Sequence, residues 1–155
     1  MFRGMGYKSE VFYDICSESL KDRLHPWDYY KKFSGPETVL IAHYSLDHPK
    51  LNALYRLPDK AVLAYHNITP PKFFEKISLQ VAEECRRGRT RLPSFKDRVT
   101  CAVGSNNFNL AELELAGFHQ NFRVPELIDF KSYLTPPNPK IIAELNRDDT
   151  VTWLF

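Results

Sequence analysis

The chain has 155 residues, of which 43% are hydrophobic and 14% aromatic, enough apolar material for one ordinary domain and too much for a disordered chain. The net charge is only +2 and no half of the chain is strongly basic, so composition does not favour nucleic acid as a partner. No apolar run approaches the length of a membrane span. Three widely spaced cysteines without a CxxC motif disfavour a disulfide framework or zinc knuckle and predict a reducing compartment, the cytoplasm.

The chain begins with what resembles the last turn of a helix, ended by Gly6. Several β-type runs follow. Three of them are short, continuous and rich in β-branched residues, which is typical of strands buried on both faces. The predicted strands are 7–13, 38–43, 61–65, 99–103, 121–125 and 150–155.

Helical patterns lie between these runs. Apolar spacing and flanking Pro, Gly or Asn residues predict helices over 47–56, 73–87, 107–116 and 138–145. Asn138 and Pro139 are the residue types expected at the N-cap and first turn of the last helix. The alternation of strand and helix predicts an α/β fold: a Rossmann-like, doubly wound, mainly parallel sheet with helices on both faces.

Ligands of open α/β sheets bind beyond the carboxyl ends of the strands, where the strand order reverses. Polar side chains follow four of the predicted strands, with Asp14 after the first of them, whereas the opposite strand ends carry ordinary solvated turns. We therefore expect a polar cleft at the carboxyl edge. Its candidate substrate-binding residues are His43, Ser45, His66, Asn67, Thr69, Ser105 and Asn107.

His66 is the strongest candidate for a functional side chain because it directly follows a predicted buried strand and would project into this cleft. An imidazole there can polarise a carbonyl or hold a hydroxyl. The alternative is a structural histidine bonded to a neighbouring loop. His43 has a packing role beside Tyr44 as its alternative, and Ser105 or Asn107 can cap the helix that follows them.

Two further patterns have competing interpretations. His43, Asp47, His48 and His66 raise the alternative of a metal hydrolase, although their spacing fits zinc poorly. The basic run 86–91 suits anionic lipid headgroups or, more simply, the solvated end of a helix. The motifs GxGxxG, GxxxxGK[ST] and GxSxG are missing, which disfavours the nucleotide-binding loops and the hydrolase elbow that they mark.

Four segments resemble the N-terminal domain of family 4 glycosyltransferases. Residues 62–74 read VLAYHNITPPKFF, similar to the third-strand motif of a bacterial branch of that family, and 39–45 read VLIAHYS, similar to the preceding strand and loop. Residues 104–113 read GSNNFNLAEL, like the family's serine turn and following helix. Residues 125–129 read PELID, like its proline–aspartate segment. The resemblance covers nearly the whole chain.

The resemblance implies the GT-B architecture, in which two Rossmann-like domains face a cleft. The first domain mainly receives the acceptor and the second mainly binds the nucleotide-sugar. His66 would be the catalytic residue, in contact with the transferred sugar. The implied reaction is transfer, with retention, from a nucleotide-sugar to a saccharide, lipid-linked or small-molecule acceptor. No metal or other cofactor is implied beyond the donor co-substrate.

The chain departs from the family at both ends. It lacks a first strand, glycine loop and helix, so 1–149 is expected to be an acceptor-side domain without its start. Residues 150–155 would be the first strand of a donor domain or the linker to it. We expect this fragment to be inactive alone, and its sheet to repack or to pair with another chain, such as a second copy. A non-catalytic Rossmann-like binding module is the alternative. The expected location is the cytoplasm or the inner face of its membrane.

Overall fold

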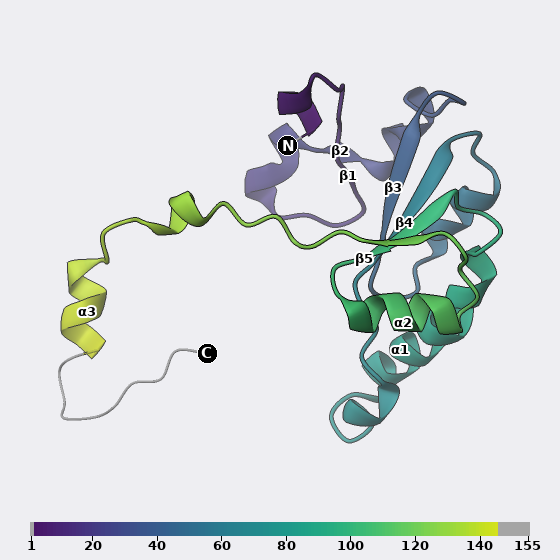
Figure 1. Cartoon of the computed structure of the whole chain (residues 1–155). Coiled ribbons are helices and arrows are strands. Elements are labelled where there is room, and N and C mark those ends of the chain that lie inside the picture. Colours follow the sequence, from purple (N-terminus) through teal and green to yellow (C-terminus); the bar gives the residue numbers. More distant parts are fainter. Residues whose placement is uncertain (1, 146–155) are drawn as a thin grey trace. The chain divides into compact units, whose positions relative to one another are not determined.

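The computed structural model describes residues 2–145. The chain divides into two compact units, Met1–Pro125 and Glu126–Phe155, which are described separately (Figure 1).

The first unit is built on a parallel sheet. Its four strands are β3 (Val39–Tyr44), β4 (Lys60–Tyr65), β5 (Cys101–Gly104) and β6 (Asn121–Arg123). They stand side by side in the order β3-β4-β5-β6, and every neighbouring pair is parallel. The predicted α/β class with a parallel sheet is confirmed, and the arrangement is consistent with a Rossmann-like one. All four strands overlap predicted runs.

Helical segments connect these strands. They are η4 (Pro49–Tyr55), η5 (Pro71–Phe73), α1 (Leu79–Arg91), η6 (Leu92–Phe95) and α2 (Asn107–Leu115), the η elements being 3-10 helices. The helix predicted to begin at Phe73 begins instead at Leu79, because Ser78 caps it by accepting a hydrogen bond from the Val81 N–H at 3.3 Å. The helix predicted over 47–56 is the 3-10 helix η4.

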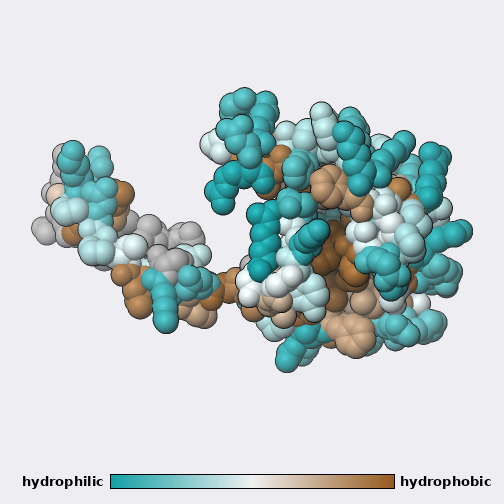
Figure 2. All heavy atoms as spheres, turned by 90° about the horizontal axis from the view of Figure 1, so that it is seen from above, coloured by the Kyte–Doolittle hydropathy of each residue, from teal (hydrophilic) through white to brown (hydrophobic). Residues whose placement is uncertain are grey.

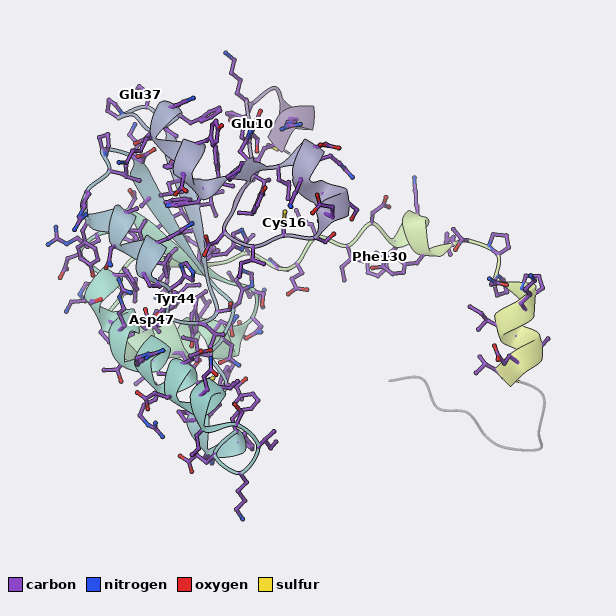
Figure 3. All side chains as sticks on the ribbon, turned by 180° about the vertical axis from the view of Figure 1, so that it is seen from behind. Glu10, Cys16, Glu37, Tyr44, Asp47 and Phe130 are labelled. Carbon is purple, nitrogen blue, oxygen red and sulfur yellow. The ribbon has the colours of Figure 1, made fainter. Side chains whose placement is uncertain are left out.

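Both long helices pack on one face of the sheet. Tyr44 and Tyr65 are neighbours across β3 and β4, so their side chains leave the sheet on the same side. The Tyr44 hydroxyl donates to the Gly88 carbonyl of α1 at 2.7 Å, and the Tyr65 hydroxyl donates to Glu112 of α2 at 2.6 Å. Figure 3 shows Tyr44 beside α1.

The prediction of helices on both faces is therefore not met within residues 2–145. The reason is the strand order, which follows the chain from β3 to β6 without reversing. Successive right-handed crossovers in such a sheet bring every connection to the same side. The reversal point at which we expected the cleft is likewise not found among these four strands.

The core lies between the sheet and this helical layer. Its fully buried large side chains are Tyr44, Leu63, Tyr65, Ile68, Phe95 and Leu113. The opposite face is more open: β3 alternates between buried Leu40, Ala42 and Tyr44 and exposed Val39, Ile41 and His43. The continuous apolar run of β3 thus does not mark a strand buried on both faces.

The N-terminal segment forms a second, two-stranded sheet. The strand predicted over 7–13 is reduced to β1 (Phe12–Tyr13), which pairs in parallel with β2 (His25–Pro26) and not with the main sheet. Around them lie the 3-10 helices η1 (Phe2–Met5), η2 (Glu18–Arg23) and η3 (Trp27–Lys32). Gly6, at φ +88°, directly follows η1, as a helix-ending glycine would.

Aromatic packing orders this segment, and its buried Tyr30 belongs to the same core cluster as Leu40 of β3. Phe12 meets the buried Tyr30 ring edge-on at 4.9 Å, and Trp27 stacks on the same ring at 4.9 Å. The Tyr30 hydroxyl donates to Asp59, just before β4, at 2.6 Å. Burial and the Asp59 carboxylate raise the pKa of the Tyr30 hydroxyl, so it remains a proton donor.

The second unit contains η7 (Phe130–Tyr133) and α3 (Pro139–Leu145). The start of α3 is as predicted, with the Asn138 side chain accepting from the Lys140 N–H at 3.0 Å. The strand predicted over 150–155 lies outside the described residues. Within residues 2–145, no helix is long and apolar enough to cross a membrane.

Candidate functional site

Two histidines meet at the carboxyl edge of the sheet. His43 is the penultimate residue of β3, and His66 directly follows β4. The His66 N–H donates to the Tyr44 carbonyl at 2.9 Å, which extends the β3–β4 ladder to this point. His43 Nδ1 lies 2.6 Å from His66 Nε2, and the rings stack with centroids 4.9 Å apart. The structure therefore brings together the two histidines that the sequence placed at this edge.

The hydrogen bond between these rings determines which ring nitrogens are left to bind a ligand. Burial, followed by the nearby His66, lowers the pKa of His43, so this imidazole is neutral at neutral pH. A neutral imidazole has one N–H donor and one acceptor nitrogen. When both rings are neutral, the two nitrogens outside the shared bond, His43 Nε2 and His66 Nδ1, form one donor and one acceptor, whichever ring donates in that bond. A sugar hydroxyl, which both donates and accepts, matches such a pair.

The loop after β4 turns sharply at Asn67, whose φ of 63° lies in the left-handed region. Asparagine enters this region more readily than most residues. The Asn67 amide oxygen is buried, and it has no hydrogen-bond partner among the described residues. The turn thus leaves an acceptor one residue from His66 that ligand or water can satisfy.

A buried network holds this loop from the helical side. The Tyr65 hydroxyl donates to Glu112 Oε2 and accepts from the Ile68 N–H at 3.2 Å. Arg89 donates to the Ile68 carbonyl at 2.6 Å and to Glu112 Oε1 at 2.5 Å. Burial and the Glu112 carboxylate raise the pKa of Tyr65. Sequence reasoning missed this network because its members are far apart in the chain and form no local motif.

The network also explains part of the basic run 86–91. Arg89 is engaged with Glu112, Arg91 donates to Asp47 at 2.6 Å, and Arg86 pairs with Glu75 at 3.2 Å. These three guanidinium groups serve mainly to tie α1 to its surroundings. The interpretation of the run as a structural helix end is favoured over a free basic patch.

The start of α2 is the third part of the edge. Asn106, rather than Ser105 or Asn107, is the N-cap, accepting from the Asn109 N–H at 3.0 Å. The Ser105 hydroxyl lies 3.3 Å from Asn109 Nδ2, and Asn107 accepts from Arg123 at 3.3 Å.

Asn109 itself is a buried polar residue that sequence reasoning missed, with an exposed fraction of 2%. Its Nδ2 group donates to the Tyr65 carbonyl at 3.2 Å, so it joins α2 to the end of β4. The apolar spacing of this helix gave no reason to predict a buried asparagine at this position. Ser105 reaches the end of β4 only through this amide.

The other predicted residues are placed less centrally. Ser45 is exposed and lines, together with His43, a cavity of about 380 Å³. Thr69 is exposed. Asn107 faces β6 through its contact with Arg123. The structure therefore joins His43 and His66 directly, has Asn67 as the next residue in the chain after His66, and leaves Ser45 and Thr69 exposed.

The four residues of the metal alternative are divided between separate interactions. His43 bonds to His66, Asp47 accepts from Arg91, and His48 Nε2 lies 2.8 Å from the Asp14 carboxylate. Within residues 2–145, no three His, Cys, Asp or Glu side chains are grouped so as to hold a metal ion.

Comparisons of the chain with known protein-family models, with curated proteins and with solved structures gave no match.

Proposed function

We propose that the chain is the acceptor-side part of a glycosyltransferase. The reaction would move a sugar, with retention, from a nucleotide-sugar donor to a saccharide, lipid-linked or small-molecule acceptor. The observation that supports it most is the hydrogen-bonded pair formed by His43 and His66 at the carboxyl ends of two neighbouring parallel strands. This is the edge at which open α/β sheets bind ligands, although the four strands themselves contain no reversal of strand order. The resemblance of residues 62–74 to the third-strand motif of family 4 adds to this support.

His66 is the catalytic residue in this proposal. It would bind a hydroxyl of the transferred sugar close to the reacting carbon. His43 orients the His66 ring through their 2.6 Å hydrogen bond and sets which nitrogen is free. Ser45, Asn67 and Thr69 would complete the sugar contacts around the pair, and Ser105 and Asn107 would contribute from the start of α2.

The proposal includes a second domain. The chain would form the N-terminal half of a GT-B architecture, and a donor domain would supply the site for the nucleotide. We therefore expect the chain to be inactive alone. The protein would act in the cytoplasm, at the inner face of the membrane when the acceptor is lipid-linked.

The test is a transfer assay on the product of the complete reading frame and on this chain alone. Both are incubated with radiolabelled UDP-, GDP- and ADP-sugars and with saccharide and polyprenyl-phosphate-linked acceptors. We expect labelled acceptor from the complete product and none from the chain. Transfer by the chain alone would contradict the proposal that a second domain supplies the nucleotide site. A complete product that neither transfers nor hydrolyses any donor would contradict the enzyme proposal.

A non-catalytic binding module is the second candidate. It is favoured by the outer edge of β3, which pairs with no strand among the described residues, since exposed sheet edges are used by modules that bind other chains. The same assay separates the two candidates, because a binding module gives no turnover with any donor.

A further inference from the structure

The outer edge of β3 offers main-chain groups that nothing in the described chain uses. β3 is the first strand of the sheet, and in the part of the chain that the structure describes it pairs with β4 alone. In the β3–β4 register the Thr38 and Tyr44 carbonyls accept from the Lys60 and His66 N–H groups. By the alternation of a parallel ladder, the N–H and C=O groups of Val39, Ile41 and His43 point away from β4. Within residues 2–145, no hydrogen bond to these groups is found.

A groove lies along this edge. The cavity of about 380 Å³ is lined by the four consecutive residues 40–43 of β3 and by both residues of β1. Because side chains alternate between the two faces of a strand, a cavity lined by consecutive residues meets the strand at its edge. Half of its other lining residues are apolar, and the rest are polar or charged. The apolar ones are Trp27, Leu46, Leu51, Ala53 and Leu54. The hollow visible in Figure 2 has apolar, brown atoms at its floor. A row of polar main-chain groups therefore faces a space with mainly apolar walls.

Two polar contacts fix the position of the N-terminal segment beside β3, whether or not a ligand occupies the groove. Near the carboxyl end of β3, Asp14, directly after β1, bonds to Lys50 and to His48 at 2.8 Å. Near the amino end of β4, Tyr30 of η3 bonds to Asp59 at 2.6 Å. Hydrogen bonding to Lys50 lowers the pKa of the Asp14 carboxyl, so the first contact persists at neutral pH. The groove is thus preformed.

We propose that this groove binds an extended peptide segment of another polypeptide as an added strand along β3. The occupant must supply main-chain donors and acceptors at the spacing of a strand, about 3.3 Å per residue, which a peptide does. Its alternate side chains enter the apolar lining, so apolar residues are required at every second position. This activity does not depend on the proposed sugar transfer.

A peptide fits this edge better than a second copy of the whole domain. The groove is walled on its far side by Phe12 and Tyr13, and in a symmetric pair of β3 edges those walls would collide or have to be displaced. A single extended chain needs only the space between the two walls. Dimerisation through β3 is accordingly an outcome that contradicts the proposal.

The first measurement is amide hydrogen exchange on the full ¹⁵N-labelled chain. Without ligand, the amides of Val39, Ile41 and His43 should exchange faster than those of Leu40, Ala42 and Tyr44, which bond to β4. The probe is the acetylated, amidated peptide KVTVTVTK, and saturating amounts should protect the first set. Slow exchange of the Val39, Ile41 and His43 amides in the free chain would overturn the proposal. If their protection rises with protein concentration, the cause is dimerisation through β3, which contradicts the proposal equally.

The variant Ile41→Pro removes one outward N–H without touching the β3–β4 ladder, and Pro is tolerated on edge strands. It should weaken peptide binding about tenfold or more, while the control Ile77→Val, at an exposed isoleucine outside the groove, binds normally. Should the proline variant not fold, a peptide N-methylated at both its valines and its threonines replaces it as the test, because either set of N–H groups can face β3 according to the direction of the peptide. Equal binding by the proline variant, or by the methylated peptide, would refute strand addition.

Discussion

The substitution Gly104→Ala tests how closely the end of β5 packs against α2. A Cβ atom at Gly104 would lie 2.7 Å from Asn109 Cβ and 3.4 Å from the Asn109 carbonyl carbon. The clash is the first of these contacts, and the position of a Cβ atom is set by the backbone, so a side-chain rotation of Asn109 cannot relieve it. The first turn of α2 would have to move away from the sheet. That movement would strain the hydrogen bond from Asn109 Nδ2 to the Tyr65 carbonyl.

Overpacking of this kind costs about 1–3 kcal/mol. The assay is urea unfolding followed by circular dichroism, and we expect the free energy of unfolding to fall by that amount with an unchanged m-value. The control is Gly35→Ala, where the new Cβ would meet only the Thr38 hydroxyl at 3.8 Å and stability should change by less than about 0.5 kcal/mol. Equal stability of Gly104→Ala and the original chain would refute the described packing.

Two further predictions concern the residues around the histidine pair. Tyr65→Phe leaves the Ile68 N–H without its acceptor and Glu112 without one donor, so the free energy of unfolding should fall by about 1–3 kcal/mol in urea titrations; a neutral effect would contradict the network. His43 has a folded-state pKa below its ordinary value of 6.5, so its contribution to stability is present above pH 6.5 and is lost as pH falls through the lowered pKa. Unfolding measured from pH 5 to 8 should show this slope, and His43→Gln should reduce it; an identical slope in both proteins would refute it.

The sheet and its polar edge were predictable because they rest on local patterns. Short β-branched runs marked β3 and β4, and a glycine, asparagine and apolar spacing marked α2. Parallel strands end at one edge, so residues that follow consecutive strands are neighbours. This geometric rule is why His43 and His66, far apart in sequence, could be placed together beforehand.

The remainder depends on long-range choices that no local pattern encodes. The run 7–13 is β-type, yet only Phe12 and Tyr13 pair, and their partner is β2. Strand order decides which face receives the helices, and the sequence of β3 reads the same in either arrangement. The start of α1 was missed because Ser78, a local cap, overrides the apolar spacing that begins earlier. The Tyr65–Glu112–Arg89 network joins three elements and leaves no motif.

The most direct test of the proposed function is the turnover of the complete product carrying His66→Ala. The proposal predicts that kcat falls on the order of 10²-fold with the nucleotide-sugar that it uses, because a hydrogen bond to the reacting sugar is lost. His119→Ala, at an exposed histidine before the amino end of β6, should transfer sugar normally. Circular dichroism of both variants establishes that they fold. Turnover by a folded His66→Ala protein equal to that of His119→Ala would contradict the assignment of His66 as the catalytic residue.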